Sequence, residues 1–195
     1  IGSDEILAES IDKEHPKYEF IEIIKKEHRR LRDKLNEFLN FAKPSKPQII
    51  PNQINDVVKS TINLASKQAS KISCTLTLSL AENIPLVPMD ASHVQQILLN
   101  LVLNGCQAMP HGGQLLIKTW SEKNGVWLSV RDEGGGISEE NKNKIFDPFY
   151  STKNEGTGLG LAIVKQLIES LKGEIRVESN NQGSTFLIRI PYETK

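Results

Sequence analysis

The sequence has few of the features that mark secreted, membrane-spanning or polyanion-binding proteins. Only two cysteines, Cys74 and Cys106, occur among 195 residues. Neither lies in a CxxC or Cys–His pattern, which argues against a disulfide framework or a structural zinc site. No apolar run approaches the ~20 residues that cross a bilayer, and the first residues lack a signal-peptide pattern. We therefore expect a cytoplasmic chain in which both cysteines are buried small hydrophobes.

Charge of one sign is not in excess, because Lys+Arg and Asp+Glu both total 24. Bulk electrostatics therefore cannot hold nucleic acid or an acidic membrane surface, and we expect neither as a partner. Any anionic ligand must be bound by a local site.

Residues 18–42 have the pattern of an amphipathic helix that needs a partner. Apolar residues recur at alternating steps of three and four, and most of the other positions are charged or carry amides. Prolines at 44, 47 and 51 cannot continue a helix, so we place a linker at 43–52, between residues 1–42 and a domain at 53–195. The stripe consists of Ile21, Ile24, His28, Leu31, Leu35, Phe38 and Ala42.

The domain at 53–195 alternates between helical and strand patterns. Helical spacing occurs in three segments: one that begins at Ile54, one that follows a predicted N-cap at Asp90, and one at 159–171. This order predicts an α/β fold, a two-layer sandwich in which helices cover one face of a mostly antiparallel sheet. Strand patterns occupy residues 72–80, 114–120, 126–131, 174–179 and 185–190.

Two glycine-rich stretches are candidate ligand sites. Asp132 ends a strand and is followed by Gly134, Gly135 and Gly136, where a flat ligand could approach the backbone closely. The stretch GTGLGLAIV, residues 156–164, places three glycines just before a helix, where free amides favour phosphate. Either stretch alone is weak evidence for a site, because glycine-rich runs also occur as plain turns, which is the more frequent case.

Asn100 and Asn104 lie four apart on one face of the helix that follows Asp90. Each could simply be exposed to solvent. A carboxamide oxygen is also a suitable ligand for Mg²⁺, which commonly joins protein through one or two oxygens and the phosphates of a substrate. Lys153, at the end of IFDPFYSTK, is either a surface charge or a phosphate contact.

Taken in order, these motifs resemble those of the ATP-binding domain of sensor histidine kinases, the GHKL family with the Bergerat fold. NLVLNGCQAM resembles the N box, DEGGGI the G1 box, IFDPFYSTK the F box, GTGLGLAIV the G2 box and GSTF the last glycine–threonine element. FDPFYSTK followed by GTGLGLAI is especially similar to the nitrogen-sensor, NtrB-like branch. The helix at 18–42 resembles the second helix of the family's dimerisation hairpin.

The resemblance implies roles for individual residues. Asp132 would accept a hydrogen bond from the adenine amino group, Thr185 would support the same base edge, and Asn104 would coordinate Mg²⁺ between the phosphates. Lys153 would contact the γ-phosphate, and residues 138–158 would move as a lid. The implied ATP site is Asn100, Asn104, Asp132, Gly134, Gly136, Ile137, Lys153, Gly156, Thr157, Gly158, Leu159, Gly160, Leu161 and Thr185, with Asn100, Asn104 and Lys153 as catalytic residues.

The same resemblance implies transfer of the γ-phosphoryl group of Mg-ATP to a histidine, with a response-regulator receiver domain and a second copy of the chain as partners. Related ATPases use a glutamate to activate water where this chain has Asn100, and a carboxamide is a poor base, so transfer is favoured over hydrolysis. The alternatives are a GHKL-type ATPase and a nucleotide-binding or dimerisation module without turnover.

No HExxNP-like H box, the family's usual acceptor motif, occurs in the sequence. The four histidines, His15, His28, His93 and His111, are interpreted as structural, and the acceptor is expected outside this chain. We expect the first hairpin helix to be missing, no direct membrane contact by this fragment, and a parent protein that could be membrane-anchored.

Overall fold

The computed structural model describes residues 18–42, 46–70, 73–153 and 156–193. The chain forms two compact units, residues 1–43 and residues 44–195. Within the described part of the chain, no helix is long and apolar enough to span a bilayer.

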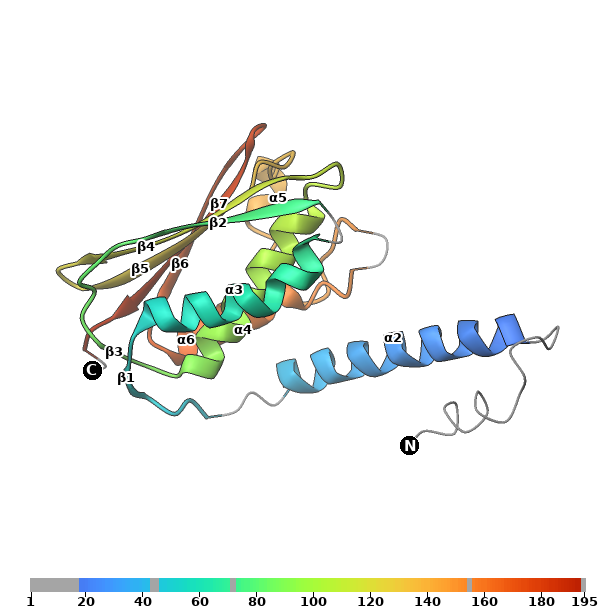
Figure 1. Cartoon of the computed structure of the whole chain (residues 1–195), viewed down its shortest axis with the longest axis horizontal. Helices are drawn as coiled ribbons and strands as arrows, with labels where there is room; N and C mark the ends of the chain where they lie inside the picture. The colour runs from blue at the N-terminus through green and yellow to red at the C-terminus, as the bar shows by residue number, and fades with distance from the viewer. Residues whose placement is uncertain (1–17, 43–45, 71–72, 154–155, 194–195) are drawn as a thin grey trace. The chain divides into compact units, whose positions relative to one another are not determined.

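The described part of the first unit is one helix, α2 (Tyr18–Ala42), as the apolar spacing predicts (Figure 1). Ile21 is buried, whereas Ile24, Leu31, Leu35 and Phe38 are 45–65% exposed. Phe20, Ile23 and Leu39 are also exposed, so the apolar surface of α2 is broader than the predicted stripe.

The second unit contains a five-stranded sheet in the order β2-β4-β5-β7-β6 and a separate pair of strands, β1 and β3. Only β2 and β4 run parallel; the other neighbours in the large sheet are antiparallel. The elements are β1 (Ile50–Asn52), α3 (Ile54–Ser70), β2 (Cys74–Leu80), β3 (Val87–Met89), α4 (Ala91–Gln107), β4 (Gly113–Glu122), β5 (Gly125–Arg131), α5 (Glu139–Lys142), α6 (Gly160–Ser170), β6 (Glu174–Asn180) and β7 (Gly183–Pro191).

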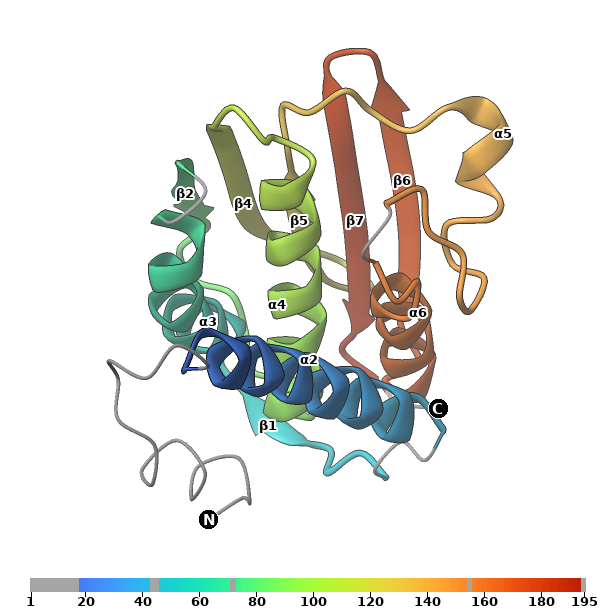
Figure 2. The same ribbon diagram turned by 90° about the vertical axis from the view of Figure 1, so that its right-hand side faces the viewer.

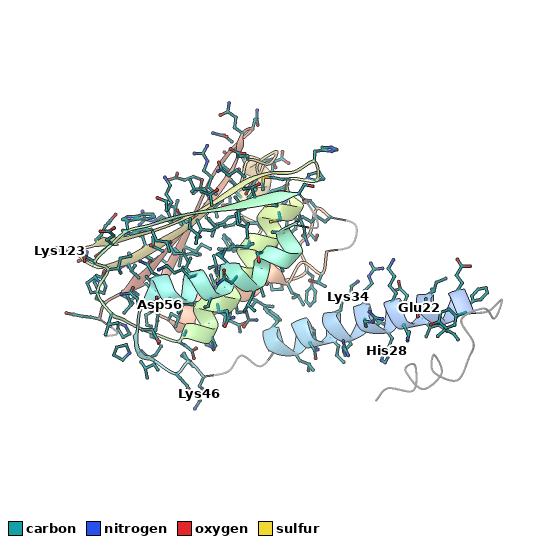
Figure 3. All side chains as sticks on the ribbon, viewed as in Figure 1. Glu22, His28, Lys34, Lys46, Asp56 and Lys123 are labelled. Carbon is teal, nitrogen blue, oxygen red and sulfur yellow. The ribbon has the colours of Figure 1, made fainter. Side chains whose placement is uncertain are left out.

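Helices α3, α4 and α6 lie side by side over one face of the large sheet, with α4 in the middle (Figure 2). Alternate residues of β5 and β7 point toward these helices. The apolar faces of α4 and α6 complete the core, and side chains fill the space between the two layers (Figure 3). The predicted two-layer sandwich is therefore confirmed. Buried residues of this core include Val94, Ile97, Leu101, Leu128, Val130, Ile163, Leu167, Phe186 and Ile188.

Two short elements differ from the sequence prediction. β1 occupies residues 50–52, inside the stretch predicted to be linker, and pairs with β3, which was not predicted. Three-residue strands that contain Pro51 and Pro88 carry no periodic signal, and proline is tolerated there because the pair lies outside the large sheet. Helix α5, four residues long, lies within residues 138–158, the segment expected to move as a lid, for which no helix was predicted.

Asp90 joins the start of the second unit to α4. Its Oδ1 accepts hydrogen bonds from the amide and hydroxyl of Ser92 (2.8 and 2.6 Å) and from the amide of His93 (3.3 Å). Its Oδ2 accepts one from the amide of Gln48 (2.7 Å). Burial by itself would raise the pKa of Asp90, but these hydrogen bonds outweigh it and lower the pKa below 3.8. Asp90 is thus the N-cap that the sequence predicts and also an anchor for residues before β1.

Asp90→Ala should lower the free energy of unfolding at pH 7 by about 1–2 kcal/mol, because α4 loses its cap and Gln48 its acceptor. A lowered folded pKa contributes stability above the unfolded value and loses it as pH falls through the folded value, so the difference between wild type and variant should shrink below pH ~3.8. Denaturant unfolding at several pH values measures this. Asp56→Ala, an exposed aspartate in the first turn of α3 (Figure 3), is the control and should cost less; an equal cost would contradict the anchoring role.

Candidate nucleotide site

Asp132 follows β5 directly and is only 4% exposed. Its Oδ1 accepts hydrogen bonds from the backbone amides of Gly134 (2.9 Å) and Ser184 (3.2 Å), and its own amide donates to the carbonyl of Ser184 (2.9 Å). Its Oδ2 receives no hydrogen bond from any residue that the structure describes. One oxygen is therefore fixed by the backbone, and the other is left for a ligand.

Burial shifts the titration of this carboxyl group. Desolvation raises the pKa of Asp132, while the amides of Gly134 and Ser184 and the positive charge of Lys153 lower it, and the net direction is upward. A buried carboxylate of this kind is stabilised by a further donor, which a bound ligand can supply.

Glycines bring the loop after Asp132 close to its neighbours. A Cβ on Gly134 would come within 2.8 Å of the carbonyl oxygen of Ala108, at the end of α4. Gly136 has φ +76°, and a Cβ there would overlap the carbonyl of Asn180. The amide of Ile137 donates to Ser179 Oγ (2.7 Å), so the loop is attached to the ends of both α4 and β6.

One face of α4 carries three carboxamides, Asn100, Asn104 and Gln107, at positions i, i+4 and i+7. Asn100 Nδ2 donates to the carbonyl of Gly160 at the start of α6 (3.4 Å). Gln107 Oε1 accepts a hydrogen bond from Lys153 Nζ (2.8 Å). Asn104 lies between them, half-buried, and its carboxamide makes no hydrogen bond with another residue in the described ranges.

Lys153 therefore lies between α4 and the buried carboxylate. Desolvation lowers the pKa of Lys153, and the negative charge of Asp132 opposes that shift.

Gln107 was not predicted from the sequence, although it continues the Asn100–Asn104 face by one further helical turn. That periodicity is the signal that could have found it.

The glycines of residues 156–160 fit closely against the preceding loop. Gly158 has φ +69°, a Cβ there would overlap the backbone of Phe149, and the amide of Phe149 donates to the carbonyl of Gly158 (3.1 Å). The amide of Leu159, a buried residue, donates weakly to Thr157 Oγ1 (3.4 Å). Gly160 and Leu161 open α6, whose first amides lack partners within the helix. Residues 154–155 of the predicted lid lie outside the described residues.

Thr185 is a predicted site residue whose side chain does not point toward Asp132. Thr185 pairs with Arg131 across the antiparallel β5–β7 ladder, so both side chains point to the sheet face away from the helices. Its neighbour Ser184 is buried and gives its amide to Asp132. A one-residue change along a strand moves the side chain to the other face, and Ser184 therefore replaces Thr185 as the candidate base-pocket residue.

Among the described residues, no three or more His, Cys, Asp or Glu side chains come together as a metal site. A metal at Asn104 would depend on oxygens of a ligand and on water, which fits the way Mg²⁺ is bound beside phosphates.

Residues 89–194, more than half of the chain, match the model of the histidine kinase-, DNA gyrase B- and HSP90-like ATPase family. The chain belongs to this family. Its similar proteins include sporulation kinase E of Bacillus subtilis, 31% identical over 97% of this chain, and the sensor histidine kinase ZraS of Escherichia coli K12, 33% identical over 89% of it. The chain spans 26% and 38% of the length of these two relatives.

Solved structures give the same grouping. Full-length ShkA in complex with AMPPNP matches 97% of this chain and 42% of its own, with a TM-score of 0.85 and 25% identity. The histidine kinase ThkA in complex with the response regulator TrrA matches 97% of this chain and 55% of its own, with a TM-score of 0.76 and 26% identity.

Asp132→Asn should leave the protein as stable as the wild type at pH 7, or more stable. A raised folded pKa means that protonation stabilises the fold at low pH, and that this contribution is lost as pH rises through the folded pKa. At pH 7 the folded state therefore bears the cost of a buried charge, which asparagine lacks, and the amide oxygen of asparagine can still accept from Gly134 and Ser184.

Asp132→Ala is the matched control, because it leaves both amides without an acceptor and should cost roughly 1–3 kcal/mol. Thermal or denaturant unfolding at pH 7 compares the two variants. An equal loss of stability in both variants would show that the charge of Asp132 does not lower the free energy of unfolding.

Proposed function

We propose that this chain binds Mg-ATP and is the catalytic part of a sensor histidine kinase that transfers the γ-phosphoryl group to a histidine. The observation that carries the proposal is the buried carboxylate of Asp132, with one oxygen unpaired, beside the carboxamide face of α4 and the ammonium of Lys153. Membership of an ATPase family and similarity to named sensor histidine kinases support it.

Asp132 would select adenine. Its Oδ2 is an acceptor on a side chain that is only 4% exposed, and an exocyclic amino group supplies the donor that this oxygen lacks. Ser184 would hold the pocket together through its amide, and Gly135, where a Cβ would meet no atom within 4 Å, would allow the flat base to lie against the backbone.

The phosphates would extend along α4 toward α6. Asn104 offers a hard oxygen for Mg²⁺, Lys153 a positive charge, and the amides of Gly160 and Leu161 a helix N-terminus. Lys153 would exchange its hydrogen bond with Gln107 for the γ-phosphate. In phosphoryl transfer such positioning and charge neutralisation supply most of the catalysis.

Asn100 favours transfer over hydrolysis. Its carboxamide donates to the carbonyl of Gly160 and cannot take a proton from water. A GHKL-type ATPase or a non-catalytic nucleotide-binding module stays the second candidate, and turnover to phosphate without a phosphorylated product would favour the ATPase.

We further propose that the acceptor histidine is none of the four in this sequence. His93 is buried, with Nδ1 3.1 Å from Ser170 Oγ, and His28, an exposed residue of α2 (Figure 3), occupies a position of the predicted stripe. His15 lies outside the described residues.

The exposed apolar side chains of α2 support a homodimer through that helix. The phosphoryl group would then pass to a response-regulator receiver domain, and the chain would act in the cytoplasm. The NtrB-like branch stays a prediction.

Two variants separate the base pocket from the metal site. Asp132→Asn should weaken ATP binding by roughly 1.5–3 kcal/mol with or without Mg²⁺, because a carboxamide is a weaker partner for the adenine amino group. Asn104→Ala should lose most of the Mg²⁺-dependent part of the affinity and keep the rest. Calorimetric titration measures both. If Mg²⁺ strengthens ATP binding equally in the wild type and in Asn104→Ala, the metal role is wrong.

The chain alone should not phosphorylate itself. Incubation with labelled ATP, followed by acid and alkali treatment, tests this, because phosphohistidine is acid-labile and alkali-stable. Adding a fragment that carries an H-box helix should produce alkali-stable label on that fragment, and Asn104→Ala should abolish it. Stoichiometric alkali-stable label on this chain alone, lost on changing His28 or another of its histidines, would place the acceptor here and overturn this part of the proposal.

A further inference from the structure

Cys74 and Cys106 form a buried pair of thiols that the nucleotide site does not use. Cys74 is the first residue of β2, and Cys106 lies in the last turn of α4, 32 positions further along the chain. Their sulfur atoms are 2.7 Å apart, and the two side chains are 7% and 0% exposed. They are the only cysteines in the sequence, and both are free thiols.

The backbone holds the two residues together. β2 runs parallel to β4, with Cys74 opposite Gly113. A Cβ on Gly113 would come within 2.6 Å of the sulfur of Met109, so the chain leaving α4 turns back tightly onto the start of β2. Gly112, at φ +86°, lies against the carbonyl of Ser73 and completes this turn. Close packing at the end of α4 and at the start of β2 therefore keeps the two sulfur atoms near each other.

We propose that Cys74 and Cys106 are an oxidative modification site, at which a small peroxide converts the two thiols into an intramolecular disulfide that ties β2 to α4. A disulfide bond is ~2.05 Å long, so the sulfurs need to approach by less than ~1 Å. Two buried thiols from different elements at this separation are already positioned for the bond.

Cys74 reacts first. Burial, together with the hydrogen bond to Cys74 and its charge, raises the pKa of Cys106 to about 12, so Cys106 keeps its proton, and its Sγ–H donates to Cys74 Sγ. As the sulfur of Cys74 attacks a peroxide oxygen, the thiol loses its proton and the O–O bond breaks. The departing hydroxide takes that proton and leaves as water, and Cys74 becomes a sulfenic acid. The sulfur of Cys106 then attacks Cys74 Sγ, the S–O bond breaks, and the proton of Cys106 leaves with the hydroxide as a second water. Two thiols are oxidised and one peroxide is reduced to two waters.

The disulfide would fix the end of α4, where the helix meets the site described above. Gly105, next to Cys106, packs against the side chain of Leu115 so closely that a Cβ would overlap it, and Ala108 packs against Gly134. Oxidation would therefore restrain the turn of α4 that carries Gln107 and Ala108. This inference needs no nucleotide and does not depend on the proposed kinase activity.

The experiment treats the 195-residue chain with hydrogen peroxide and counts thiols in denaturant. We expect two titratable thiols before treatment and none after it, a monomeric product with one peptide linking Cys74 to Cys106, and recovery of both thiols with dithiothreitol. The oxidised form should unfold roughly 5–10 °C higher than the reduced form, as expected for a native cross-link of this loop size. Cys74→Ala and Cys106→Ala should show no such shift.

Three outcomes would overturn the proposal. They are retention of both thiols, oxidation of one cysteine to the sulfinic acid without a link, and a disulfide between two chains. Because the thiol count is made on the wild-type chain, the result stands even if an alanine variant fails to fold.

Discussion

The carboxylate of Asp132 has to be held inside the protein, and the rest of the site is arranged around that requirement. Backbone amides of Gly134 and Ser184 supply two donors to one oxygen, which joins the end of β5 to the start of β7. These amides can reach the carboxylate only because the chain turns sharply at Gly134–Gly136 and because Gly183 lies against the carbonyl of Asp132 without a side chain. The remaining oxygen is the polar feature that a ligand must satisfy.

Helix α4 connects this pocket to the other candidate groups. Its first turn is capped by Asp90, which also holds residues that precede β1, and its middle turns present Asn100 and Asn104. Its last turns contact Lys153 through Gln107 and pack on Gly134 through Ala108. A shift of α4 would therefore change the distances between the proposed base pocket at Asp132 and the groups proposed to contact the phosphates. Cys106 lies on the core side of the same turns, which is why its chemistry bears on the position of the helix.

Most of the fold could be predicted from the sequence because its long elements have strong periodicity. The heptad-like spacing of α2, the cap at Asp90 and the alternation of apolar residues with Ser and Thr in β2 each follow from local patterns. β1 and β3 could not be predicted, since a three-residue strand that contains a proline shows no periodic pattern of apolar residues. Their pairing also joins segments 37 residues apart. In the candidate site, motif order pointed to Asp132 and Asn104, whose roles stay predictions, and the choice between Ser184 and Thr185 depends on strand register. The contact between Gln107 and Lys153 depends on how a loop lies over a helix, which no local pattern encodes.

We infer that the unpaired oxygen of Asp132 accepts a hydrogen bond from an amino group of the base. Calorimetric titration of the unmodified chain with ATP and with GTP, each with Mg²⁺, tests it directly, because the two nucleotides share their phosphates and sugar and differ only in the base. Guanine presents a carbonyl oxygen where adenine has its amino group, so GTP would meet the carboxylate with an acceptor. The account predicts that GTP binds roughly 10- to 100-fold more weakly, the loss expected for one hydrogen bond to a charged group. Equal affinities for the two nucleotides would contradict it.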